Sequence, residues 1–145
     1  MEDGIRRRTH SRPAARGSDR LLAYAAALYG IGLVAHTADH IRRGAGVLTL
    51  EVKWAGIVST AIGVATIALV LARHRLAPLA AVVVGAPIAV GVAAVHLLPH
   101  WSVWSDAFPG AQATDVSPLS WAVVLLEIAG ALALLAAGTY VLRHQ

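Results

Sequence analysis

The sequence predicts an all-α integral membrane protein, a bundle of four transmembrane helices with both termini in the cytoplasm. The chain of 145 residues is 57% hydrophobic and 14% charged, with a mean hydropathy of +0.65, which is too apolar for an ordinary soluble domain. Four apolar runs each have the roughly 20 residues that cross a hydrocarbon core about 30 Å thick as a helix. Basic residues gather in the segments expected on one side of the membrane.

The first twenty residues, MEDGIRRRTHSRPAARGSDR, form a basic tail. They hold six of the twelve basic residues and lack apolar periodicity, so we expect a disordered cytoplasmic tail beside anionic headgroups rather than a nucleic-acid surface. A signal peptide is the competing interpretation, but the next apolar run exceeds the usual core of about 7 to 15 residues and no cleavage site follows it. We therefore expect a tail at residues 1–20 and one transmembrane domain at residues 21–145.

The four predicted spans are separated by segments that interrupt helices. Residues 21–41 end at RRGAG, and residues 52–72 end at RHR. Residues 78–98 end at the long segment PHWSVWSDAFPGAQATDVSP, and residues 119–142 lead to the C-terminus.

Each span also carries small or polar residues at helical spacing, which is where transmembrane helices approach one another closely. These residues are Tyr29, Gly32 and His36; Gly56, Ser59, Thr60 and Gly63; Gly85 and His96; and Ser120, Glu127, Gly130 and Gly138. The pattern predicts a compact bundle.

The distribution of charge predicts the orientation. The tail has six arginines, the second loop has Arg73 and Arg75, and the last residues include Arg143, whereas the third loop has no basic residue but contains Asp106 and Asp115. By the positive-inside rule, both termini and the second loop are cytoplasmic. Three basic residues in and beside the first loop oppose this rule but are outnumbered. The alanine- and arginine-rich composition resembles that of high-GC bacteria, so we expect a bacterial plasma membrane.

Ionisable side chains are costly inside a bilayer, by about 2.5 to 3.5 kcal/mol at its midplane, and they usually carry function. His36 and His40 are four residues apart, so they share one face of the first helix. Asp39 lies close to the same face. Such a pair can hold one metal ion, and the carboxylate can fix a histidine tautomer.

Further polar residues are expected at the same membrane depth. His96 closes the third span, His100 follows Pro99 at the start of the loop, and Glu127 lies about 12 Å below the outer end of the fourth span. With alternating helix directions, all of these residues converge on the extracytoplasmic half. Asp106 could fold over them as a lid and supply a ligand or base.

Imidazole and carboxylate groups favour a divalent transition metal, with zinc as the first choice, because the chain has no cysteine and one methionine. The three histidines of the spans are expected as primary ligands, and the other groups complete the first or second shell. The predicted metal-binding residues are His36, His40, His96, His100, Asp39 and Glu127.

Other functions stay open at this point. The cluster could be a polar network without metal in a structural or accessory subunit, or part of an ion or proton transport system. Two histidines on different helices could also bind haem, which ranks below a single metal ion. A homo-oligomer or a partner membrane subunit is compatible with each function, and the sequence does not decide whether the protein is an enzyme.

The motif HTADH resembles the His and Asp-His patterns on the first helices of nickel and cobalt permeases and of hydrogenase or urease accessory membrane proteins. This resemblance covers His36, Asp39 and His40 only. Those families have longer His-to-Asp spacings and more helices, so nickel transport is not carried over to this chain.

Overall fold

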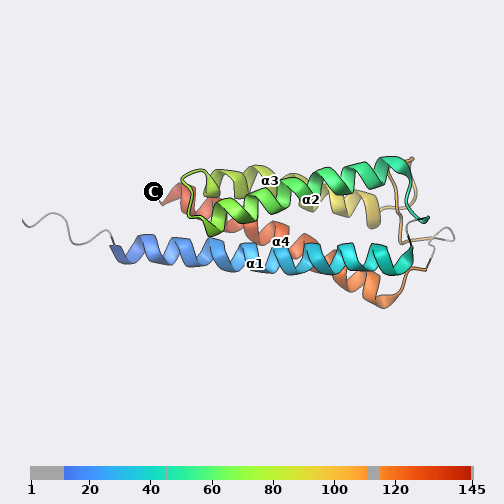
Figure 1. The fold of residues 1–145 in the computed structure, drawn as a ribbon, viewed down its shortest axis with the longest axis horizontal. Helices are drawn as coiled ribbons and strands as arrows, with labels where there is room; N and C mark the ends of the chain where they lie inside the picture. The colour runs from blue at the N-terminus through green and yellow to red at the C-terminus, as the bar shows by residue number, and fades with distance from the viewer. Residues whose placement is uncertain (1–11, 45, 111–114, 145) are drawn as a thin grey trace, which may run out of the picture.

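The computed structural model describes residues 12–44, 46–110 and 115–144, and all regular structure within these ranges is helical. The helices are α1 (Arg12–Arg43), α2 (Leu50–Leu71), α3 (Ala77–His96) and α4 (Pro118–Arg143). They lie side by side in an elongated bundle (Figure 1), with the α1–α2 and α3–α4 connections at one end and the α2–α3 connection at the other. All four are long and apolar enough to cross a membrane.

The four predicted helices are confirmed, and α1 is longer than expected at its N-terminal end. It begins at Arg12 and extends beyond the other helices (Figure 1), so residues 12–20 of the expected tail are helical. An apolar span nucleates a helix, and alanine and arginine then extend it at little cost. Residues 1–11 lie outside the described residues, and the domain boundary at residue 20 stays a prediction.

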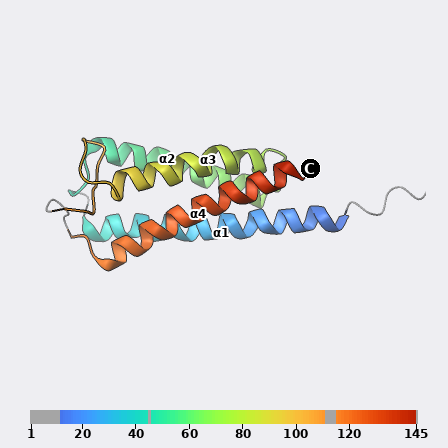
Figure 2. The same ribbon diagram turned by 180° about the vertical axis from the view of Figure 1, so that it is seen from behind.

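The central helix of the bundle is α4, which runs obliquely against both α1 and α3 (Figure 2). Glycines permit this close approach. A Cβ added at Gly32 of α1 would lie 2.6 Å from Glu127 Cα, and one added at Gly130 of α4 would lie 2.5 Å from Tyr29 Cα. Small residues at helical spacing therefore do bring these backbones together, as expected for helices that pack in lipid.

In contrast, α2 is covered on one side only. Its buried residues are Val52, Gly63, Thr66 and Val70. Large apolar side chains such as Trp54, Ile57 and Ile62 point outward, and an apolar groove of about 750 Å³ lies between α1 and α2. These surfaces suggest a lipid bilayer as the environment.

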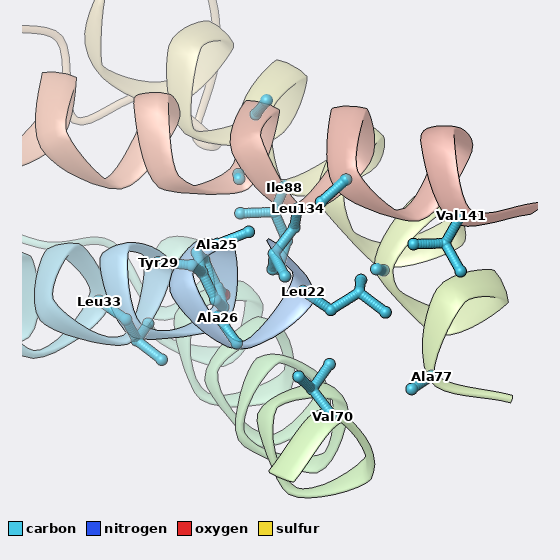
Figure 3. Close-up of a cluster of buried hydrophobic side chains, with 14 residues drawn as sticks. Leu22, Ala25, Ala26, Tyr29, Leu33, Val70, Ala77, Ile88, Leu134 and Val141 are labelled. Carbon is cyan, nitrogen blue, oxygen red and sulfur yellow. The ribbon is translucent and has the colours of Figure 1, made fainter. Parts of the chain in front are cut away.

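The half of the bundle that holds the start of α1 and the end of α4 is filled by an apolar core. Leu22, Ala26, Ile88 and Leu134 pack together there (Figure 3). Tyr29 belongs to this core, and its hydroxyl lies against Gly63 without a hydrogen-bond partner among the described residues. Side chains from α1, α3 and α4 therefore pack closely in this half, and Leu134 and Tyr29 are fully buried.

The other half of the bundle is polar, and the tryptophans mark its end. Trp54 lies near the start of α2, Trp121 near the start of α4, and Trp101 and Trp104 in the segment between α3 and α4. Tryptophan is enriched where a membrane protein meets the headgroups. The position of these four rings is consistent with a membrane–water interface at this end.

Candidate metal centre

Three histidines meet at the polar end of the bundle. His36 and His40 project from the last turns of α1, and His96 is the final residue of α3. The ring centroid of His36 lies 4.5 Å from that of His40 and 4.8 Å from that of His96, and the other two are 5.4 Å apart. His36 and His96 are only 7% and 3% exposed, whereas His40 is partly exposed.

Each histidine offers one ligand nitrogen, and these three atoms lie within 4.8 Å of one another. Atoms no farther apart than this fit within about 2.8 Å of a common point, compared with zinc–nitrogen bonds of about 2.0 to 2.1 Å. Small side-chain rotations would close the difference. The three residues therefore lie close enough to hold a metal ion.

The Nδ1 atoms of two of these histidines already have acceptors. His36 Nδ1 bonds Glu127 Oε2, and His96 Nδ1 lies 3.1 Å from the backbone oxygen of Asp106. A carboxylate or carbonyl oxygen accepts, so each ring donates from Nδ1 and keeps the lone pair of Nε2 free. Metal-binding histidines characteristically donate their second ring nitrogen to such acceptors.

Two other nitrogens of the cluster are buried without a hydrogen-bond partner among the described residues. They are His36 Nε2 and His40 Nδ1. A buried polar atom without a partner costs about 1 to 3 kcal/mol, so such atoms require a ligand, a water molecule or a functional reason. A cation bound to His36 Nε2 would satisfy this requirement for that atom.

Glu127 lies beside the cluster as the hydrogen-bond partner of His36. Asp39 points elsewhere, because its Oδ1 accepts a hydrogen bond of 2.8 Å from Arg42 Nε. The same guanidinium reaches Ser120 Oγ at 3.1 Å, at the start of α4. His100 lies on the exposed segment after α3, outside the three-histidine group.

Asp106 and Arg43 complete the polar end. Asp106, which the sequence suggests as a lid residue, is buried with its Oδ2 3.4 Å from His96 Nδ1 and 3.8 Å from His40 Nδ1. Arg43, one of the three basic residues in and beside the first loop, is only 5% exposed and binds both carboxylate oxygens of Asp106. Its spacing of three and seven residues from the α1 histidines could have placed it on their face.

The geometry also bears on haem. A bis-histidine haem has the macrocycle between its two axial rings. Here the three histidine rings contact one another directly, which leaves no room for a porphyrin between any two of them. A single ion fits the cluster better.

Buried charged and histidine side chains of the described residues all lie at this end of the bundle: His36, Asp39, Arg43, His96, Asp106 and Glu127.

No model of a known protein family matches the chain, and no curated protein or solved structure is detectably similar to it. The function therefore has to be inferred from the site itself.

Proposed function

We propose that this chain is a multi-pass plasma-membrane protein that binds one divalent transition metal ion, with zinc as the first choice, through His36, His40 and His96. One observation carries the proposal. His36 is held by a carboxylate at Nδ1, while its Nε2 is buried and has no partner among the described residues. This is the arrangement of a histidine that is oriented to bind a metal.

A polar network without metal is less well supported. Such a network stabilises a bundle when its buried groups are hydrogen-bonded to one another, and it becomes costly when groups are left over. The cluster leaves His36 Nε2 and His40 Nδ1 without partners in the described structure. Each neutral imidazole has one donor and one acceptor nitrogen. Glu127 and the Asp106 carbonyl already use the Nδ1 donors of His36 and His96, so the acceptor nitrogens of these two rings are left for a cation.

The proposed orientation places both termini in the cytoplasm and the metal site near the extracytoplasmic face. Arg73, Arg75 and Arg143 lie at the end of the bundle that also holds the start of α1. At the opposite end, Arg42 and Arg43 are paired with Asp39 and Asp106, so their charges are compensated. At the first end Asp19 pairs with Arg73, but basic residues outnumber acidic ones there, so this end is the one expected inside the cell.

The arrangement favours metal binding over conduction by a single copy. A transport path needs polar groups along the whole span, or a second conformation that exposes the site on the other side. The half of the bundle beyond Tyr29 is filled by Leu22, Ala26, Ile88 and Leu134. The site therefore exchanges ions with the side where the α3–α4 segment lies.

The test is the metal content and metal affinity of the protein purified in mild detergent. We expect a near-stoichiometric ion, or uptake of added Co²⁺ with the visible absorption of a nitrogen-ligated site. The variant His36→Ala/His40→Ala should lose both. The matched control is His74→Ala, because His74 is exposed in the α2–α3 turn, and it should bind as the wild type does.

Two results would overturn the proposal. One is a protein that contains no metal and takes up none on titration with zinc, iron, manganese, nickel or copper ions. The other is equal binding by the wild type and the double alanine variant. Either result would favour the polar network of a structural or accessory subunit, for which a stoichiometric partner in a mild-detergent pull-down is the positive test.

A further inference from the structure

The segment that connects α3 to α4 folds back into the end of the bundle. Its residues 105–108 are all buried. The backbone nitrogen of Asp106 bonds Val95 O at 3.1 Å, and that of Phe108 bonds His96 O at 2.9 Å. The Phe108 ring packs against His96 with centroids 4.9 Å apart. The segment is therefore attached to the same turn of α3 that presents a proposed ligand.

Arg43 fixes the carboxylate of this segment. Its two terminal nitrogens lie 2.6 and 2.8 Å from the two oxygens of Asp106, and its guanidinium carbon lies 5.2 Å from the centroid of the Phe108 ring. A bidentate arginine–carboxylate pair sets both the position and the plane of the carboxylate. Because Arg43 shares the α1 face with His36 and His40, it aligns Asp106 with that face.

The result is one carboxylate that faces the Nδ1 atoms of two histidines. Asp106 Oδ2 lies 3.4 Å from Nδ1 of His96 and 3.8 Å from Nδ1 of His40. His40 Nδ1 has no hydrogen bond among the described residues, and a shift of less than about 1 Å would bring it within ordinary bonding distance of this oxygen. Glu127 has the same relation to His36.

We propose that Asp106 is an outer-shell residue of the metal site and that Arg43 positions it. When the ion is bound, the Asp106 carboxylate accepts a hydrogen bond from Nδ1 of His40, while the Asp106 backbone oxygen keeps the hydrogen bond from Nδ1 of His96. The inference rests on the proposed function. It assigns His40 the Nε2 atom as ligand, as the hydrogen bonds of His36 and His96 already indicate for those rings. The inference also means that the site has all of its outer-shell groups only when residues 105–108 pack against the end of the bundle.

The experiment compares Co²⁺ affinity and the visible Co²⁺ spectrum of the full chain and its variants. Asp106→Asn keeps the shape of the side chain and removes its charge, so affinity should fall by about 10- to 100-fold, which is typical of an outer-shell loss. The positions of the cobalt bands should be retained, because no ligand is lost. The control is Asp115→Asn, an exposed residue of the same segment, and both readouts should stay at wild-type values.

Asp106→Asn removes the carboxylate that both terminal nitrogens of the buried Arg43 bind, which can itself destabilise the fold. The double variant Arg43→Gln/Asp106→Asn removes both charges and keeps two amide side chains that can bond each other. We expect the same loss of affinity in the double variant, with helix content by circular dichroism as the check on folding.

The outcomes separate this inference from the function on which it rests. Wild-type protein that binds no cobalt refutes the metal site itself. If the wild type binds but both Asp106 variants bind equally well, Asp106 has no part in the site. A cobalt spectrum that changes coordination in Asp106→Asn would make Asp106 a direct ligand and overturn its outer-shell role.

Discussion

Replacement of Gly32 by alanine should disrupt both the bundle and its polar end. Gly32 lies one turn before His36 on α1 and faces the backbone of α4. A Cβ at this position would lie 2.6 Å from Glu127 Cα and 2.8 Å from Glu127 N. Carbon atoms in contact are normally about 3.5 to 4.0 Å apart, so the two helices must separate locally by about 1 Å.

This separation has an energetic and a functional consequence. Overpacking of an interface of this kind costs about 1 to 3 kcal/mol, which the higher helix propensity of alanine, about 1 kcal/mol, offsets in part. Because Glu127 is the same residue that orients His36, the displacement also strains the bond between them. We therefore expect lower stability together with weaker metal binding, by about tenfold or more.

The measurement is the free energy of unfolding in mixed micelles, followed by tryptophan fluorescence, with Co²⁺ titration of the same samples. The matched control is Gly56→Ala on α2, where an added Cβ meets no atom within 4 Å among the described residues. The free energy of unfolding of this control should be equal to or higher than that of the wild type. The reasoning is refuted if the two variants unfold at the same denaturant concentration and Gly32→Ala retains the wild-type cobalt affinity.

Three further variants or conditions test the polar half. Glu127→Gln should weaken metal binding by about 10- to 100-fold without abolishing it, and wild-type affinity would remove Glu127 from the site. Tyr29→Phe should leave the free energy of unfolding unchanged or raise it, because the buried hydroxyl has no partner among the described residues, and a loss above about 1 kcal/mol would show that it is bonded. Histidine ligands must be neutral to bind a metal, so cobalt affinity should fall at a pH low enough to protonate these buried imidazoles, and wild-type affinity that persists down to the pH of acid unfolding would exclude histidine ligands.

The helices could be predicted because their signals are local. An apolar run of about 20 residues with basic residues or proline at its ends is sufficient to mark a span, and three of the four helices begin and end within about two residues of the predicted bounds. The start of α1 differs because helix extension into a polar tail depends on small propensities rather than on the apolar pattern.

The site could be predicted in part. The alternating directions of the helices bring the end of α1 and the end of α3 to one end of the bundle, which is sufficient to associate His36, His40 and His96. The partner of each histidine depends on side-chain rotamers and on the path of a loop without periodic pattern. For this reason the sequence left Glu127 undecided between ligand and partner, and it did not pair Asp106 with Arg43.

The division of the bundle into two halves limits what the site can do. Below His36 the buried face of α1 becomes apolar within one turn, about 5 Å, because Leu33 and Tyr29 already belong to the hydrophobic core. Because the apolar core blocks the other half of the bundle, an ion bound at His36 would enter and leave on the side of residues 105–108. Asp106 belongs to residues 105–108 and is bound by Arg43. Displacement of these residues would therefore open the site to solvent and also remove an outer-shell hydrogen-bond acceptor. Under the proposed function, access to the site and affinity for the ion are coupled through the Arg43–Asp106 ion pair. Arg43→Gln/Asp106→Asn should therefore release bound cobalt faster than Glu127→Gln, even at similar affinity.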